Sequence, residues 1–146
     1  MKKIFLIGYL MVITVYGLGQ VKDSAKAKKD TVAYENYDMV FTKVDIESSF
    51  EGGRQAWGDF LRKNINGNVP KNNGSPVGHY TVEVEFVVDK DGTVSDINIV
   101  KNPGYGTSEE VIRIMKLSPK WKPGIQNGVF VKSRKKQKVT FLVEKS

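Results

Sequence analysis

Residues 81–101 read TVEVEFVVDKDGTVSDINIVK and carry the clearest secondary-structure signal in the chain. In its first part every second residue is apolar, which is the pattern of a strand with one buried and one wet face. The apolar positions are Val82, Val84, Phe86 and Val88. Residues 89–92, DKDG, have the composition of a tight turn, and residues 94–101 follow as a partner strand with Ile97 and Ile99 inside. The stretch therefore predicts a β-hairpin.

Helical periodicity flanks the hairpin on both sides. Residues 55–65 place Ala56, Trp57 and Phe60 on one stripe, and the sequence Asn-Gly-Asn at 66–68 stops the helix. A second helix is expected after residues 107–110, TSEE, which have the form of a capping box. Its apolar face is predicted from Val111, Ile112 and Met115, and it ends at Ser118-Pro119.

Residues 129–144 alternate again and predict a last strand, with Val139, Phe141 and Val143 on its inner side. The order helix, hairpin, helix, strand predicts an α+β domain: a small antiparallel sheet of about three strands with two helices packed on one face. The expected core joins Val84, Phe86, Ile97, Met115 and Phe141, and both tryptophans, Trp57 and Trp121, are assigned to it. Residues 121–124 are expected to be irregular, and His79 is placed in a loop.

The N-terminus has the pattern of a targeting segment. Two lysines precede an apolar run, and small residues at Gly17 and Gly19 fit a cut before Gln20. We therefore expect a signal peptide over residues 1–19, a polar tether over 20–38 and a folded domain over 39–146. Cleavage is favoured, and an uncleaved anchor in the inner membrane is the alternative. Either way the domain is exported, which argues against a nucleic-acid partner.

Composition excludes several kinds of site. The 146 residues include no cysteine and one histidine, His79, which leaves little for hydrolytic chemistry or a zinc site. Residues 89–92 resemble the start of a calcium loop, but position twelve is Val100, which supplies no carboxylate. We expect no enzyme, no cofactor, no metal and no small-molecule substrate. The net charge of +7 favours solubility first and acidic partners second.

Several motifs together resemble the C-terminal domain of the TonB family, in the form found in Bacteroidetes-type bacteria. Residues 50–53, FEGG, resemble the family's Phe-Pro-Gly-Gly, with Glu51 as a departure, and Val69-Pro70 stands where Tyr-Pro is usual. The hairpin follows, then Glu109-Glu110 at a helix start. The most specific element is residues 118–124, SPKWKPG. The resemblance runs from about Val44 to Val143.

The resemblance implies a periplasmic domain that acts in TonB-dependent transport and binds an outer-membrane transporter. In the family, an N-terminal segment of the transporter, the TonB box, adds as a strand to the edge formed by the last strand, and the segment before Tyr-Pro also contacts it. Carried over, this implies a binding site formed by Asn66, Gly67, Asn68, Val69, Arg134, Lys135, Lys136, Gln137, Lys138, Thr140 and Leu142.

The lysine-rich start of the last strand, residues 132–138, has two interpretations. Charge on a sheet edge prevents pairing with other edges, and the same charge attracts an acidic partner segment. A different function is also open: a structural or regulatory envelope domain that forms a homodimer through this edge without transducing energy.

Overall fold

The computed structural model describes residues 39–145. The predicted signal peptide and tether lie outside the described residues. The elements are β1 (Val40–Phe41), β2 (Ser49–Phe50), α1 (Gly53–Asn64), α2 (Val69–Asn72), β3 (Gly78–Val88), β4 (Val94–Lys101), α3 (Thr107–Leu117), β5 (Trp121–Lys122), β6 (Gly124–Gln126) and β7 (Val129–Val143).

Three long strands form the centre of the sheet, in the order β7-β3-β4, and all pair antiparallel. The predicted hairpin is β3 and β4, and β7 pairs with β3 along its whole length, from Gly78 opposite Val143 to Val88 opposite Ser133. The short β1 adds to β7 in parallel, so the sheet is mixed, a detail that the sequence did not predict. The α+β fold class is confirmed.

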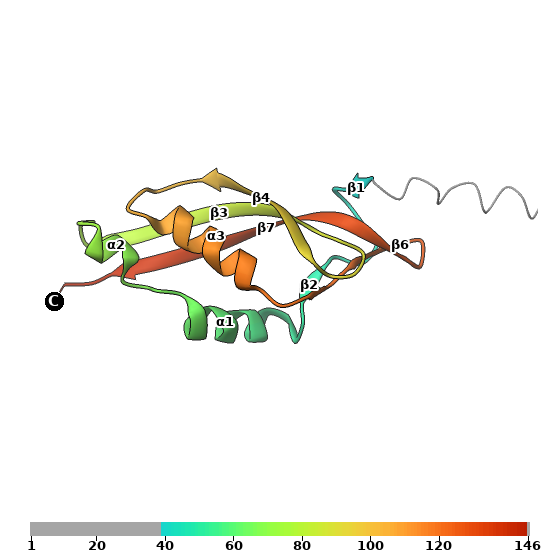
Figure 1. Cartoon of the computed structure of the whole chain (residues 1–146), viewed down its shortest axis with the longest axis horizontal. Helices are drawn as coiled ribbons and strands as arrows, with labels where there is room; N and C mark the ends of the chain where they lie inside the picture. Colours follow the sequence, from blue (N-terminus) through green and yellow to red (C-terminus); the bar gives the residue numbers. More distant parts are fainter. Residues whose placement is uncertain (1–38, 146) are drawn as a thin grey trace, which may run out of the picture. The chain divides into compact units, whose positions relative to one another are not determined.

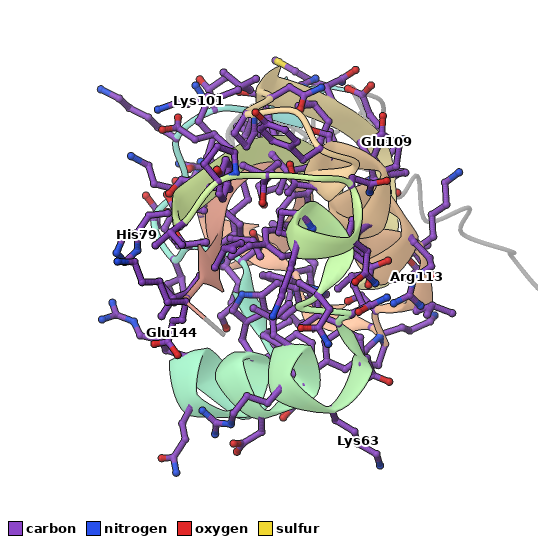
Figure 2. The ribbon with its side chains drawn as sticks, turned by 90° about the vertical axis from the view of Figure 1, so that its left-hand side faces the viewer. Lys63, His79, Lys101, Glu109, Arg113 and Glu144 are labelled. Carbon is purple, nitrogen blue, oxygen red and sulfur yellow. The ribbon has the colours of Figure 1, made fainter. Side chains whose placement is uncertain are left out.

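One core lies between the sheet and the helices. Val84 and Phe86 from β3 are fully buried, as are Val111 and Met115 from α3. Figure 1 shows α3 lying across the strands and α1 beside it on the β7 side, and the view turned by 90° agrees (Figure 2). The predicted core is confirmed, although Ile97 is only partly buried against it.

Aromatic rings fill the space where α1 meets the sheet. Phe50, Trp57, Phe60, Phe86 and Trp121 form a chain of ring contacts with centroids 5.1 to 5.6 Å apart. Such offset and edge-on contacts stabilise beyond the area they bury. Both tryptophans therefore belong to the core, as predicted.

Two local predictions are wrong. Residues 121–124 are not irregular, because β5 pairs with β2 and Gly124 begins β6, which forms a hairpin with β7. His79 lies exposed in β3 and not in a loop.

The capping box is also absent. Gly106 precedes α3 in the left-handed conformation, with φ of 73°, and no side chain caps the helix. The Thr107 hydroxyl donates to the carbonyl of Gly104 at 2.7 Å. The Glu110 carboxylate instead accepts hydrogen bonds from the backbone N–H of Asn66 and from Arg113, three residues later in α3.

Candidate functional site

The second side of β7 carries the main candidate site. β3 occupies one side of the strand. Near the start of β7, β6 pairs with residues 129–131, and β1 pairs with Lys132 and Ser133 on the side opposite β3. Within the described range 39–145, no strand pairs with the second side of β7 from residue 134 to residue 143. Such an edge leaves backbone N–H and C=O groups available to an extended peptide.

The outer face of β7 carries cations that already have partners. The Lys136 ammonium lies 3.3 Å from the carboxylate of Glu85, and the Lys138 ammonium lies 3.1 Å from that of Glu83. Directly opposite pairs of this kind fix the register of two strands. The predicted lysine-rich segment is therefore largely neutralised by the neighbouring strand.

Arg134 completes this outer-face network. Its guanidinium donates to Asp96 at 2.8 Å and to Glu85 at 3.2 Å. The hydrogen bond with Asp96 is the main reason that the pKa of Arg134 is raised. Thr140 and Thr81 share a hydroxyl hydrogen bond of 2.9 Å, and Leu142 ends the row with 52% of its surface exposed.

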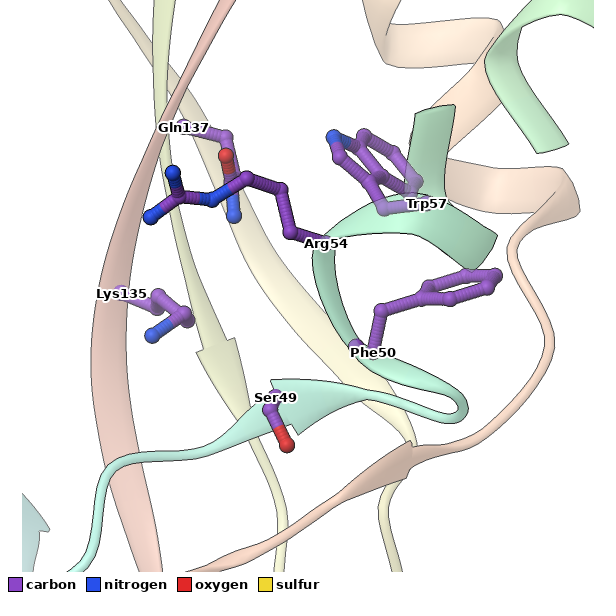
Figure 3. A pocket seen from close by; sticks show the side chains of 7 residues that line it. Ser49, Phe50, Arg54, Trp57, Lys135 and Gln137 are labelled. Atoms are coloured by element: carbon purple, nitrogen blue, oxygen red, sulfur yellow. The ribbon is translucent and has the colours of Figure 1, made fainter. Parts of the chain in front are cut away.

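The inner face of β7 presents Lys135 and Gln137 to a cavity of about 300 Å³. Its other lining residues come from β2, the start of α1 and the link between them: Ser49, Phe50, Gly53, Arg54 and Trp57. In Figure 3 the Arg54 side chain extends from α1 toward β7, with its guanidinium between Lys135 and Gln137. The cavity thus opens beside the free edge.

At the C-terminal end of β7 the two predicted segments meet. Gly67 and Asn68 line a cavity of about 230 Å³ together with Leu142 and Val143. The predicted residues 134–138 do not line this cavity, because they lie in the other half of the strand. Val69 begins α2. The predicted site is therefore one long strand edge with a cavity beside each half: one is lined by Lys135 and Gln137, the other by Leu142 and Val143.

An ion pair between the buried Glu110 and the partly exposed Arg113 holds the segment before α2. Glu110 is 8% exposed, and its carboxylate accepts from the backbone N–H of Asn66 at 2.6 Å and from Arg113 at 2.6 and 2.8 Å. Arg113 also donates to the carbonyl of Asn64 at 2.7 Å. The hydrogen bonds from Arg113 are the main cause of the lowered pKa of Glu110. The end of α1 and the predicted contact at Asn66 are thereby tied to α3.

Sequence reasoning missed Arg54 and the walls of its cavity, Phe50 and Trp57, as parts of the site. The predicted helix, residues 55–65, began one residue after Arg54, and nothing in its periodicity indicates which strand the helix faces. Glu110 was singled out as a cap and not as the anchor of Asn66.

Residues 39–145 combine a buried core, a sheet face covered by helices and an open strand edge. Among residues 39–145 no group of three histidine, cysteine, aspartate or glutamate side chains is placed to hold a metal ion. In the same range no helix has the length and apolarity needed to cross a membrane.

Residues 79–143 match the family described as the Gram-negative bacterial TonB protein C-terminal. This part of the chain, which includes β3, β4, α3 and β7, is therefore similar to a TonB C-terminal domain. A search of curated proteins found no match.

Proposed function

We propose that this domain binds an extended N-terminal segment of an outer-membrane transporter by strand addition to the free edge of β7. The observation that carries the proposal is the unpaired side of residues 134–143. A peptide strand satisfies the free backbone groups there, and pockets beside the edge select its side chains. From the FEGG and SPKWKPG motifs we also infer the Bacteroidetes-type variant of the family.

The contact at the C-terminal end supports the same mode. A peptide on the edge of β7 that passes Leu142 reaches Gly67 and Asn68, which share a cavity with that residue. The hydrogen bond from Asn66 to Glu110 holds this segment in place before the peptide arrives. A preorganised contact loses less conformational entropy on binding.

The test uses proline at Gln137 and at Lys138. Neighbouring backbone N–H groups along a strand point to opposite sides, so one of the two donates to β3 and the other points to the free side. We expect one of Gln137→Pro and Lys138→Pro to stay folded by circular dichroism yet lose binding to transporter N-terminal peptides in calorimetry. Full binding by folded variants of both positions would show that β7 is not the docking edge. Sedimentation of the free protein detects the alternative, self-association through this edge.

We further propose that residues 1–19 are a cleaved signal peptide, that residues 20–38 form a tether and that the folded domain covers 39–146. The small residues before Gln20 support the cut. Mass spectrometry of the envelope fraction is expected to find a mature chain that starts at or near Gln20. An intact N-terminus in purified inner membrane would support an anchored transducer instead.

A further inference from the structure

The cavity between α1 and β7 has an unusual lining for a surface pocket. Its floor includes Phe50 and the 7%-exposed Trp57, while Arg54 and Lys135 bring two positive charges to its rim. No carboxylate is among the lining residues. Figure 3 shows the charged ends of both side chains on the β7 side of the cavity, away from the rings.

These two cations differ from those on the outer face of β7. Lys136 and Lys138 each lie within 3.3 Å of a carboxylate on β3. In the described part of the chain, Arg54 forms no ion pair. Lys135 has Glu47 at 3.7 Å, a long contact to a side chain that is 60% exposed. Between residues 135 and 138 of β7, the positive charge that no close carboxylate balances therefore lies on the cavity side of the strand.

We propose that this cavity takes an acidic side chain of the docked peptide. The inference rests on the proposed strand addition and adds its side-chain specificity. Side chains of an added strand alternate between the two faces of the sheet, so every second one points toward the helices. The one beside Lys135 and Gln137 lies over the cavity.

An aspartate or glutamate fits the lining on two counts. Its carboxylate accepts hydrogen bonds from the guanidinium of Arg54 and from the ammonium of Lys135, and charged pairs of this kind are the stronger ones. Its methylene groups lie against Phe50 and Trp57, which excludes water from one side of the pair. A lysine or arginine at the same peptide position brings a third positive charge into the cavity.

The test uses synthetic peptides of about ten residues, in which threonine and valine alternate around one glutamate, each with a glutamine twin. The glutamate is moved along the peptide, and affinity for the full-length protein is measured by calorimetry at low salt. At one register we expect the glutamate peptide to bind about fivefold more tightly than its twin, the upper range for a partly exposed ion pair. The preference is expected to shrink in high salt.

Matched variants assign the effect. Arg54→Gln and Lys135→Gln each remove one cation from the cavity and are expected to abolish the difference in affinity between the glutamate peptide and its glutamine twin. Lys63→Gln removes the same charge from an exposed position in the last turn of α1 and is expected to keep the preference (Figure 2). A second readout is the Arg54 side-chain N–H resonance, which shifts with glutamate peptides only.

The outcomes separate the two proposals. Equal binding of glutamate and glutamine peptides at every register overturns the acidic subsite and leaves strand addition standing. A preference that survives in Arg54→Gln and in Lys135→Gln also overturns it, because the charge that selects the peptide then lies elsewhere. If no peptide of either kind binds, strand addition itself is contradicted and the subsite with it.

Discussion

The two faces of the sheet are built from the same strands but held by different interactions. On the covered face of β3, Val82, Val84 and Phe86 are fully buried. On the open face, Glu83 and Glu85 alternate with them and pair with cations of β7. Burying one such apolar side chain stabilises by about 1.5–3 kcal/mol, whereas an exposed ion pair contributes about 0–1 kcal/mol. The covered face therefore holds the fold together, while the open face mainly sets the strand register and the surface charge.

The largest expected effect tests the covered face. Phe86→Ala removes a fully buried ring whose centroid lies 5.1 Å from that of Trp121. We expect a loss of about 3–5 kcal/mol in the free energy of unfolding, measured with urea. Thr81→Ala on the open face is the control, with an expected loss of about 1 kcal/mol or less. A loss below about 1 kcal/mol for Phe86→Ala would mean that the two faces are assigned the wrong way round.

The next prediction concerns Glu110, a charge on the covered side. Glu110→Gln leaves Arg113 without its carboxylate and weakens the hold on Asn66, so we expect a loss of about 1–3 kcal/mol at pH 7. Because the folded-state pKa of Glu110 is lowered, its stabilisation is present above the unfolded value of about 4.3 and is lost as the pH falls through the folded pKa.

Urea unfolding between about pH 7 and pH 3 measures this, and the stability gap between wild type and Glu110→Gln is expected to narrow on the acid side. Glu109→Gln is the control, since its side chain is exposed one position earlier in α3 (Figure 2). A gap that stays constant across this range would show that the Glu110 carboxylate does not contribute through its charge.

The smallest expected effect tests the open face. A double-mutant cycle with Lys138→Gln and Glu83→Gln should give a coupling of about 0.2–1 kcal/mol that decreases with added salt. Both groups are partly exposed, so water screens the pair. A coupling above about 2 kcal/mol would mean that an ion pair on the open face stabilises the fold as much as a buried apolar side chain does.

Much of the fold could be predicted because its signals are local. The alternation in β3 and β7 has a period of two, and the stripe of α1 has the period of a helix. These patterns gave the hairpin, both long helices, the last strand and most of the core. The errors at Thr107 and at residues 121–124 have another cause. There the backbone conformation depends on partners distant in sequence, such as β2 for β5.

The candidate site likewise combines features that follow from local sequence with features that depend on contacts between distant segments. The sequence alone predicted that the last strand is amphipathic, that its start is basic and that residues 66–69 follow a helix. The tertiary structure was needed to show that β3 neutralises Lys136 and Lys138, that Glu110 holds Asn66, and that Arg54 lies beside Lys135. The physical reason is that alternation is set by neighbouring residues, whereas a charge finds its partner through packing between segments far apart in the chain.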